Sequence, residues 1–199
     1  MQPEAGRDAG PIINISGEKV ALGPVSRSLV PLYNRWLNDF AVGVPYFFGE
    51  VVPEHHEATE SRYEQWLKDE RTVIFTVYEG ATLRPIGVAD LHRINHINRT
   101  AEYGILIGER DCWGRGYGTE TTALLLEYGF AALDLHSILL TVFSYNERGI
   151  RAYTRADFKE VGRWREAKRL AGRVYDIVYM DCLATEFQGG ALRPLFPSV

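Results

Sequence analysis

Cysteine, long apolar runs and an excess of basic residues are what this 199-residue chain lacks. Its two cysteines, Cys112 and Cys182, are too few for a disulfide framework or a four-cysteine zinc site, and they are typical of a protein from a reducing compartment. There are 22 basic and 26 acidic residues, for a net charge of -4, which argues against a nucleic-acid-binding surface. Any anion must therefore be bound by a local feature.

Membrane and export segments are also missing. No apolar run approaches the roughly 18 residues of a membrane span, and the N-terminus has no apolar stretch typical of a secretion signal. We therefore predict a cytoplasmic protein with no membrane partner. Hydrophobic residues make up 46% of the chain, enough for one full core. We expect a flexible arm over residues 1–17, one domain over 18–184 and a tail over 185–199, disordered unless Leu192, Leu195 and Phe196 dock on a second subunit.

The spacing of apolar residues predicts the secondary structure. The predicted strands cover residues 19–25, 72–79, 85–96, 100–108, 138–144, 158–163 and 174–183, and the predicted helices cover 26–38, 54–69, 116–133 and 146–156. This order indicates an α/β (α+β) fold, in which a mixed, mostly antiparallel sheet of six to seven strands is flanked by helices. Strands 100–108 and 138–144 are expected to form a parallel pair, because a helical crossover joins them. Residues 39–53 contain too many glycines and prolines for a helix, and enough aromatic residues to form a pocket wall.

A glycine-rich turn lies between the strand 100–108 and the helix that follows it. Gly114, Gly116 and Gly118 alternate there, so the main chain can approach a ligand, and the free N–H groups of the helix start favour an anion. The pattern predicts a phosphate site. It lacks the GK[ST] of a nucleoside-triphosphate loop, and the strand 138–144 does not end in the acid that a dinucleotide fingerprint requires.

Three segments in a fixed order resemble the GNAT acyltransferase family, and most closely its branch of ribosomal-protein N-terminal and polyamine acetyltransferases. They are AEYGILIG at 101–108, WGRGYGTE at 113–120, and NERGIRAY at 146–153 followed by FKEVG. The family's phosphate loop is written (Q/R)-x-x-G-x-(G/A). Gly116 and Gly118 match its glycines, whereas Trp113 stands where Gln or Arg is usual. In the third segment, Asp157 stands before Phe158 at a position where glycine is common in the family.

The resemblance implies acetyl-CoA, or another acyl-CoA, between the strands 101–108 and 138–144, with its thioester carbonyl on main-chain N–H groups near residues 105–107. The acceptor would be a primary amine of a small molecule, amino sugar, polyamine or protein N-terminus, attacking directly in a ternary complex. The aromatic loop favours an acceptor or acyl chain with an apolar part, and the acidic excess favours a cationic acceptor. The residues implied for the cofactor are Ile105, Leu106, Ile107, Trp113, Gly114, Arg115, Gly116, Tyr117, Gly118, Thr119 and Asn146.

Four residues are candidates for proton transfer. The resemblance assigns Tyr153 as the acid that protonates the CoA sulfur, and its spacing from Asn146 allows both to face one cleft. Glu102 matches the acid of the A-E-x-G pattern and ranks first as base, before His92 and Asp90, which the strand period places on one face. A structural role as a paired polar residue is the alternative for each.

Other functions remain open in the sequence. The chain could be a GNAT-like acyl-CoA-binding module without turnover, an enzyme for longer acyl chains, or, less well supported, a nucleotide-linked oxidoreductase. No metal is predicted, because His55, His56, His92 and His96 lack a recognised ligand spacing. Arg148, Arg151 and Arg155 are expected on a solvated helix face, with contact to the CoA 3'-phosphate as the alternative. The family resemblance adds a possible homodimer.

Overall fold

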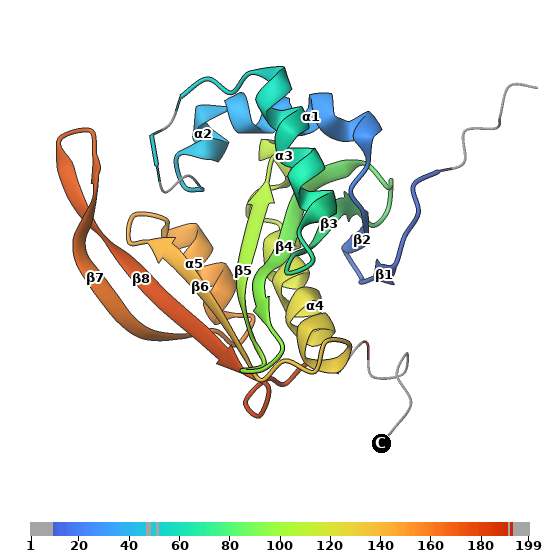
Figure 1. The fold of residues 1–199 in the computed structure, drawn as a ribbon. Coiled ribbons are helices and arrows are strands. Elements are labelled where there is room, and N and C mark those ends of the chain that lie inside the picture. The colour runs from blue at the N-terminus through green and yellow to red at the C-terminus, as the bar shows by residue number, and fades with distance from the viewer. Residues whose placement is uncertain (1–9, 47–48, 51, 191, 193–199) are drawn as a thin grey trace, which may run out of the picture.

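The structure is a computed structural model that describes residues 10–46, 49–50, 52–190 and 192. Within these residues eight strands form one sheet in the order β1-β2-β3-β4-β5-β6-β8-β7 (Figure 1). The strands are β1 (Ile15–Ser16), β2 (Val20–Pro24), β3 (Val73–Glu79), β4 (Pro85–Asn95), β5 (Thr100–Ile107), β6 (Ser137–Phe143), β7 (Lys159–Leu170) and β8 (Arg173–Leu183). All pairings are antiparallel except β5 with β6, which confirms the predicted mixed sheet.

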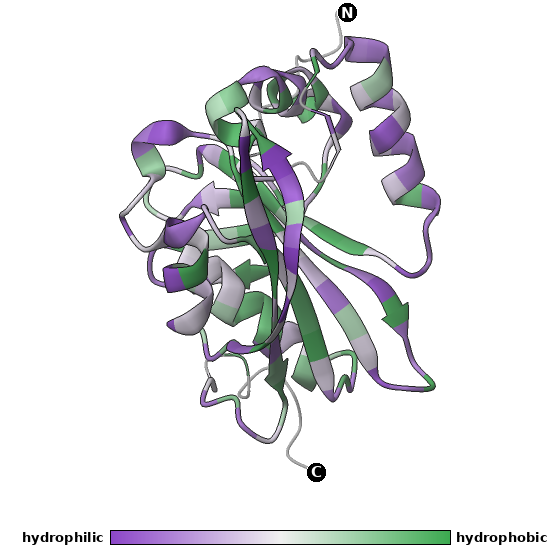
Figure 2. Cartoon of the chain, turned by 90° about the vertical axis from the view of Figure 1, so that its left-hand side faces the viewer, coloured by the Kyte–Doolittle hydropathy of each residue, from purple (hydrophilic) through white to green (hydrophobic). Residues whose placement is uncertain are grey.

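Helices cover both faces of this sheet, and Figure 2 shows α3 on the opposite side from α4 and α5. The described helices are η1 (Arg27–Leu29), α1 (Val30–Asn38), α2 (Phe40–Gly43), α3 (His56–Lys68), η2 (Arg110–Cys112), α4 (Tyr117–Ala131) and α5 (Glu147–Thr154). The predicted helices therefore form, with boundaries that shift by a few residues. None of these helices combines the length and the apolar character needed to cross a membrane.

Two hydrophobic cores result, one on each face of the sheet. The larger core packs α4 on β2 to β6 and β8 through residues such as Leu91, Leu125 and Ile138. The smaller core packs α1, α2 and α3 on the other face, around Trp36 and Val88. Because strand residues alternate between the faces, Asp90 and His92 lie on the α1–α3 face with Val88, whereas Leu91 lies on the α4 face.

The parallel pair of β5 and β6 opens along its length. The two strands pair only from Thr100 opposite Ser137 to Glu102 opposite Leu139, although β5 continues to Ile107 and β6 to Phe143. The sheet is therefore split between the far halves of these strands. The family resemblance implies an acyl-CoA between these two strands, and this is where they separate.

Four expectations need correction. Strand β1 precedes the predicted first strand because Ile15 is buried against β2, so the sheet has eight strands rather than six to seven. Residues 40–43 form the short helix α2, which the side chain of Asp39 caps by accepting from the Ala41 N–H. The apolar spacing of the predicted helix 116–133 places Ala132 among its inward-facing residues, but Ala132 follows α4 and is exposed.

The fourth correction concerns the C-terminal segment. Leu192 is 3% exposed and belongs to the larger core of its own chain, so it is not free to dock on a second subunit. Its N–H donates to Oε1 of the buried Glu127 at 2.7 Å. Leu195 and Phe196 lie outside the described residues.

Candidate functional site

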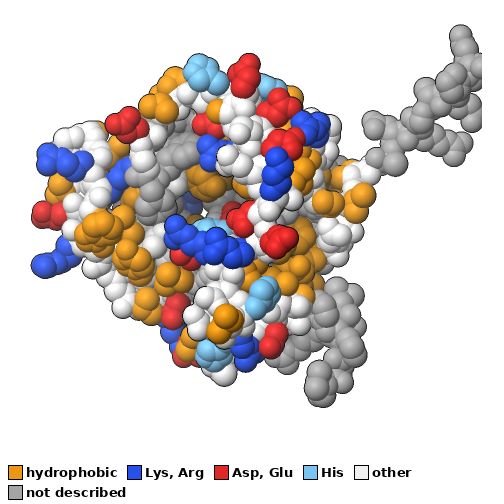
Figure 3. All heavy atoms as spheres, viewed as in Figure 1, with side chains coloured by type: hydrophobic (Ala, Val, Ile, Leu, Met, Phe, Trp, Pro, Cys, Tyr) orange, Lys and Arg blue, Asp and Glu red, His pale blue; other side chains and the backbone are white. Residues whose placement is uncertain are grey.

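A cavity of about 1070 Å³ passes through the split between β5 and β6. Figure 3 shows a hollow near the centre of the viewed face, with acidic and basic side chains next to each other at its rim. We distinguish two halves by the helices that bound them. The α4 half comprises Trp113, Gly114, Gly116, Tyr117, Gly118, Thr119, Asn146, Arg148 and Tyr153, and the α3 half comprises Tyr46, Gln65, Trp66, Asp69, Asp90, His92, Arg93 and Glu102.

The α4 half is built on the turn before α4. Gly116 has φ +89 and directly precedes the first residue of the helix, Tyr117, so a left-handed residue aims the first helical N–H groups toward the cavity. These N–H groups carry the positive end of the helix dipole. The turn therefore has the form of an anion site without needing a basic side chain of its own. Arg115 belongs to the turn, but it is not among the residues that line the cavity.

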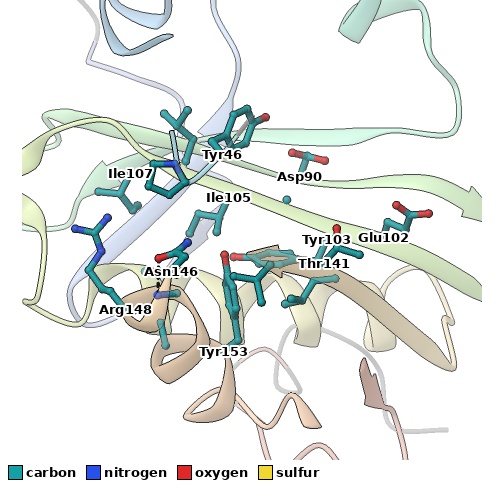
Figure 4. Close-up of a pocket in the computed structure, with 18 of the residues that line it drawn as sticks. Tyr46, Asp90, Glu102, Tyr103, Ile105, Ile107, Thr141, Asn146, Arg148 and Tyr153 are labelled. Carbon is teal, nitrogen blue, oxygen red and sulfur yellow. Dashed lines mark hydrogen bonds between the residues drawn. The ribbon is translucent and has the colours of Figure 1, made fainter. Parts of the chain in front are cut away.

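Trp113 supports the turn and lines the cavity. Its indole Nε1 donates to the carbonyl of Ile107 at 2.8 Å, which links the turn to the end of β5. The guanidinium carbon of Arg148 lies 3.7 Å from the centre of the Trp113 ring, within cation–π distance. Arg148 has no carboxylate partner among the described residues, and its side chain faces the cavity (Figure 4). The sequence groups it with Arg151 and Arg155 on a solvated face; all three line the cavity, and Arg148 is the one of them that stacks on Trp113.

Tyr153 projects from α5 into the cavity between the two halves (Figure 4). Its ring packs edge-on against Tyr103 and Phe158. Burial raises the pKa of Tyr153 to about 12, so the phenol keeps its proton at neutral pH. The hydroxyl of Tyr103 is engaged elsewhere, because it is hydrogen-bonded to Thr122 Oγ1 at 2.8 Å.

Asn146 starts the same helix. Its Oδ1 accepts from the Gly149 N–H at 3.0 Å, so the side chain is the N-cap of α5. Asn146 also lines the α4 half of the cavity. The cap fixes the start of α5 and with it the direction of Tyr153.

The α3 half carries a chain of charged groups along β4 and β5. Nδ1 of His92 is 2.6 Å from Oδ2 of Asp90, and Nε2 of His92 is 3.5 Å from Oε2 of Glu102 on the neighbouring strand. Nη1 of Arg93 lies 2.7 Å from Oε1 of Glu102. The hydrogen bond to Asp90 raises the pKa of His92, although desolvation opposes it. The three base candidates are therefore one connected cluster.

The position of Asp90 depends on a glycine in the next strand. Gly104 pairs opposite Asp90, and a Cβ at Gly104 would come within 2.7 Å of Asp90 Oδ1. The absent side chain leaves the space in which the carboxylate lies. Asp90 is thereby held over Gly104 in the middle of β5, in the wall of the cavity (Figure 4).

Several residues that line the α3 half are not predicted from the sequence. Trp66 lies on α3, Asp69 directly follows this helix, and Arg93 lies on β4, in segments that the sequence predicts only as a helix and a strand. Of the aromatic loop expected as a pocket wall, Tyr46 lines the cavity, whereas Phe40 is 48% exposed on α2 and lies outside the lining. Phe47 and Phe48 lie outside the described residues. Across the cavity, β7 and β8 contribute Trp164 and Tyr179.

The donor groups of the described residues do not form a metal centre, since no three His, Cys, Asp or Glu side chains gather in a suitable cluster there. The fold and cavity instead define a class of protein. A split parallel pair in a mixed sheet, a turn suited to an anion at one side and a partly buried tyrosine in the gap are the features of an acyltransferase that uses an acyl-CoA.

Comparison with known proteins agrees with this class. The family model for the acetyltransferase (GNAT) domain matches residues 19–159, so the chain belongs to the GNAT family. It is 31% identical over 142 residues to a spermidine N(1)-acetyltransferase of Vibrio cholerae, covering 71% of this chain and 80% of that protein. Identity to an Escherichia coli spermidine N(1)-acetyltransferase is 29% over 147 residues, or 74% of this chain and 76% of the relative.

A solved structure is similar over nearly the whole domain. The crystal structure of the Vibrio cholerae spermidine N-acetyltransferase in complex with CoA and spermine matches with a TM-score of 0.78 and 26% identity, covering 87% of this chain and all of that one. The chain is thus an acyl-CoA-dependent N-acetyltransferase with acetyl-CoA as its co-substrate. The predicted family, fold and reaction type are confirmed.

Proposed function

We propose that this enzyme acetylates a primary amine of a small polycation, with acetyl-CoA in the α4 half of the cavity and the amine in the α3 half. The observation that carries the proposal is the division of charge in the cavity. All three acidic lining residues, Asp69, Asp90 and Glu102, belong to the α3 half, where they outnumber the one arginine, Arg93, whereas Arg148 and the helix N-terminus line the α4 half without an acidic side chain. A polycation and an anionic cofactor are each attracted to the half of opposite charge.

For acetyl-CoA, which supplies an activated acetyl thioester, the proposed binding elements are mostly main-chain groups. The diphosphate would accept from the N–H groups of residues 114–119, with Arg148 as the nearby cation, and the thioester carbonyl from N–H groups of residues 105–107. Asn146 borders the space for the pantetheine arm. Two features support the fit: the left-handed Gly116 leaves the turn open, and Arg148 has no carboxylate partner within the described chain.

Tyr153 is the proposed acid. The departing thiolate needs a proton, and a phenol that is kept protonated by burial can donate one from inside the cavity. The position of Tyr153 in the gap between the strands supports this role, because both halves of the cavity meet there (Figure 4).

Glu102 is the proposed acceptor of the proton that the ammonium must lose before it attacks. It lies on the α3 side with His92 next to it, and the Asp90–His92 pair would hold the cluster in register. Asp90 and His92 stay alternatives to Glu102, because all three carboxylate or imidazole groups border the same space.

An amine panel tests the proposal by the release of free CoA thiol. Spermidine and spermine should react with a kcat/KM at least about tenfold above that of a monoamine, an amino sugar or a peptide with a free N-terminus, since two or more charges meet the acidic half. A peptide or amino sugar that reacts faster than both polyamines would contradict the proposed acceptor. Saturable acetyl-CoA binding in the same preparation provides the control for folded enzyme.

A further inference from the structure

The end of β4 beside Glu102 carries a β-bulge. His92 pairs opposite Glu102 and Asn95 opposite Thr100, so two residues of β4, Arg93 and Ile94, face a single residue of β5. Arg93 has φ +52, a left-handed conformation that is unfavourable for a residue with a Cβ. Backbone strain of this kind is often found where it directs a side chain into a functional site.

The bulge reverses the direction that alternation would give to Arg93. After His92 on the α3 side, a regular strand would place residue 93 on the α4 face, inside the larger core. Instead Ile94 occupies that core, with 4% of its surface exposed. The side chain of Arg93 is 72% exposed and lines the α3 half of the cavity. The local backbone therefore aims a guanidinium at the acceptor side.

This guanidinium binds both oxygens of Glu102. Nη1 of Arg93 is 2.7 Å from Oε1 and 3.0 Å from Oε2. A guanidinium and an alkylammonium are both cations that donate N–H groups, so they compete for the same carboxylate lone pairs. The contact that Arg93 makes is the contact that a protonated amine would make on Glu102.

We propose that Arg93 is an acceptor-specificity residue that occupies Glu102 in the free enzyme, and that a protonated amine must displace it to bind. The inference rests on the proposed function in that it takes Glu102 as the group that meets the acceptor amine. A partly exposed ion pair of this kind lowers the apparent affinity for a competing cation by about two- to fivefold. An amine that is uncharged at the assay pH does not compete with Arg93.

Arg93→Gln removes the competing charge. Its KM for spermidine should fall about two- to fivefold with kcat little changed, because only the binding equilibrium shifts. The KM for 2,2,2-trifluoroethylamine, which is uncharged at the assay pH, should stay the same. Arg93→Lys keeps a cation and should keep most of the wild-type KM. Arg99→Gln is the matched control, since Arg99 also has a positive φ and an ion pair, with Asp134, but does not line the cavity.

A second measurement guards against a variant that folds poorly. Arg93→Gly accepts the left-handed backbone without strain and removes the same charge, so it should show the same fall in KM. Calorimetric binding of spermine in the presence of CoA should show that Arg93→Gln gains no affinity when Glu102→Gln is also present. An unchanged or higher KM for spermidine in both Arg93 variants, or a gain that persists without Glu102, would overturn the inference.

The two proposals fail in different ways. If wild-type enzyme acetylates spermidine and the Arg93 variants leave its KM unchanged, only the role of Arg93 is wrong. If none of the polyamines makes the wild-type enzyme release thiol, the proposed acceptor is wrong. In that case, equal KM shifts for charged and uncharged monoamines in Arg93→Gln would reject the role of Arg93 as well.

Discussion

The two halves of the cavity differ in the material from which they are built. The α4 half uses the main chain: a glycine-rich turn and the first N–H groups of a helix, supplied by one continuous segment. The α3 half uses side chains that arrive from a loop, a helix and two strands, and two of its three acids are paired, Asp90 with His92 and Glu102 with Arg93.

This difference determines how side-chain substitutions in each half affect the enzyme. Main-chain donors do not depend on side-chain identity, so Trp113 can replace the usual Gln or Arg while it supports the turn from Ile107. In the α3 half a single substitution changes the charge that an acceptor meets. We therefore expect variants of the α4 half to affect all acceptors equally, and variants of the α3 half to affect acceptors according to their charge.

Tyr153→Phe should have the largest effect, because it removes the proton donor from the gap between the halves. We expect kcat to fall at least about hundredfold while the affinity for CoA changes less than about twofold. Tyr128→Phe is the control, since Tyr128 is a half-buried tyrosine of α4 that does not line the cavity. Equal losses in kcat and in CoA binding would show that Tyr153 supports the cofactor rather than the proton transfer.

Gly116→Val tests the main-chain site. A valine at φ +89 is strained and turns the first N–H groups of α4 away from the cavity, so CoA affinity should fall about thirty- to hundredfold for the loss of a charge-assisted hydrogen bond or two. The same substitution at Gly172, which has φ +76 in the β7–β8 turn, controls for backbone strain. Calorimetry with CoA measures both. Similar weakening of CoA by the two variants would contradict the anion site.

The same contrast explains what the sequence predicts. The α4 half was predictable because its function lies in a short segment whose glycine spacing has a local physical meaning. The α3 half was only partly predictable. Strand period placed Asp90 and His92 on one face, but Arg93 depends on a bulge, and Trp66 and Asp69 depend on how α3 packs across the sheet. Leu192 was missed because its partner Glu127 is 65 residues away in sequence.

Glu102→Gln distinguishes the base candidates. We expect kcat/KM for spermidine to fall about ten- to thirtyfold near neutral pH, less than for loss of the acid, because water can carry the proton in its place. Asp90→Asn should cause a smaller fall if that residue only positions His92. A larger loss in Asp90→Asn than in Glu102→Gln would move the role of the base to Asp90. The pH dependence of kcat/KM in each variant gives the comparison.

Arg148→Gln should weaken CoA about fivefold, since one exposed cation near a phosphate contributes about 1 kcal/mol. Because the charge acts on the cofactor, the loss should be the same with every acceptor and should shrink at high salt. Arg163→Gln, on the exposed face of β7 and paired with Glu160, is the control. A loss that depends on the acceptor would show that Arg148 also contacts the amine, and would contradict the division of the cavity into a cofactor half and an acceptor half.

The smallest effect concerns stability rather than turnover. The hydrogen bond to Asp90 raises the pKa of His92 above its ordinary 6.5, with Glu102 adding to the rise and Arg93 opposing it. The protonated imidazole therefore stabilises the fold below about pH 6.5, and this contribution disappears as the pH rises through the higher folded-state pKa.

His92→Gln should lower the free energy of unfolding by at most about 1 kcal/mol near pH 5.5, and by less near pH 9. His96→Gln, at an exposed position in the β4–β5 turn, is the control variant. A pH-independent loss in His92→Gln would mean that packing, not the charge on His92, stabilises this part of the α3 half.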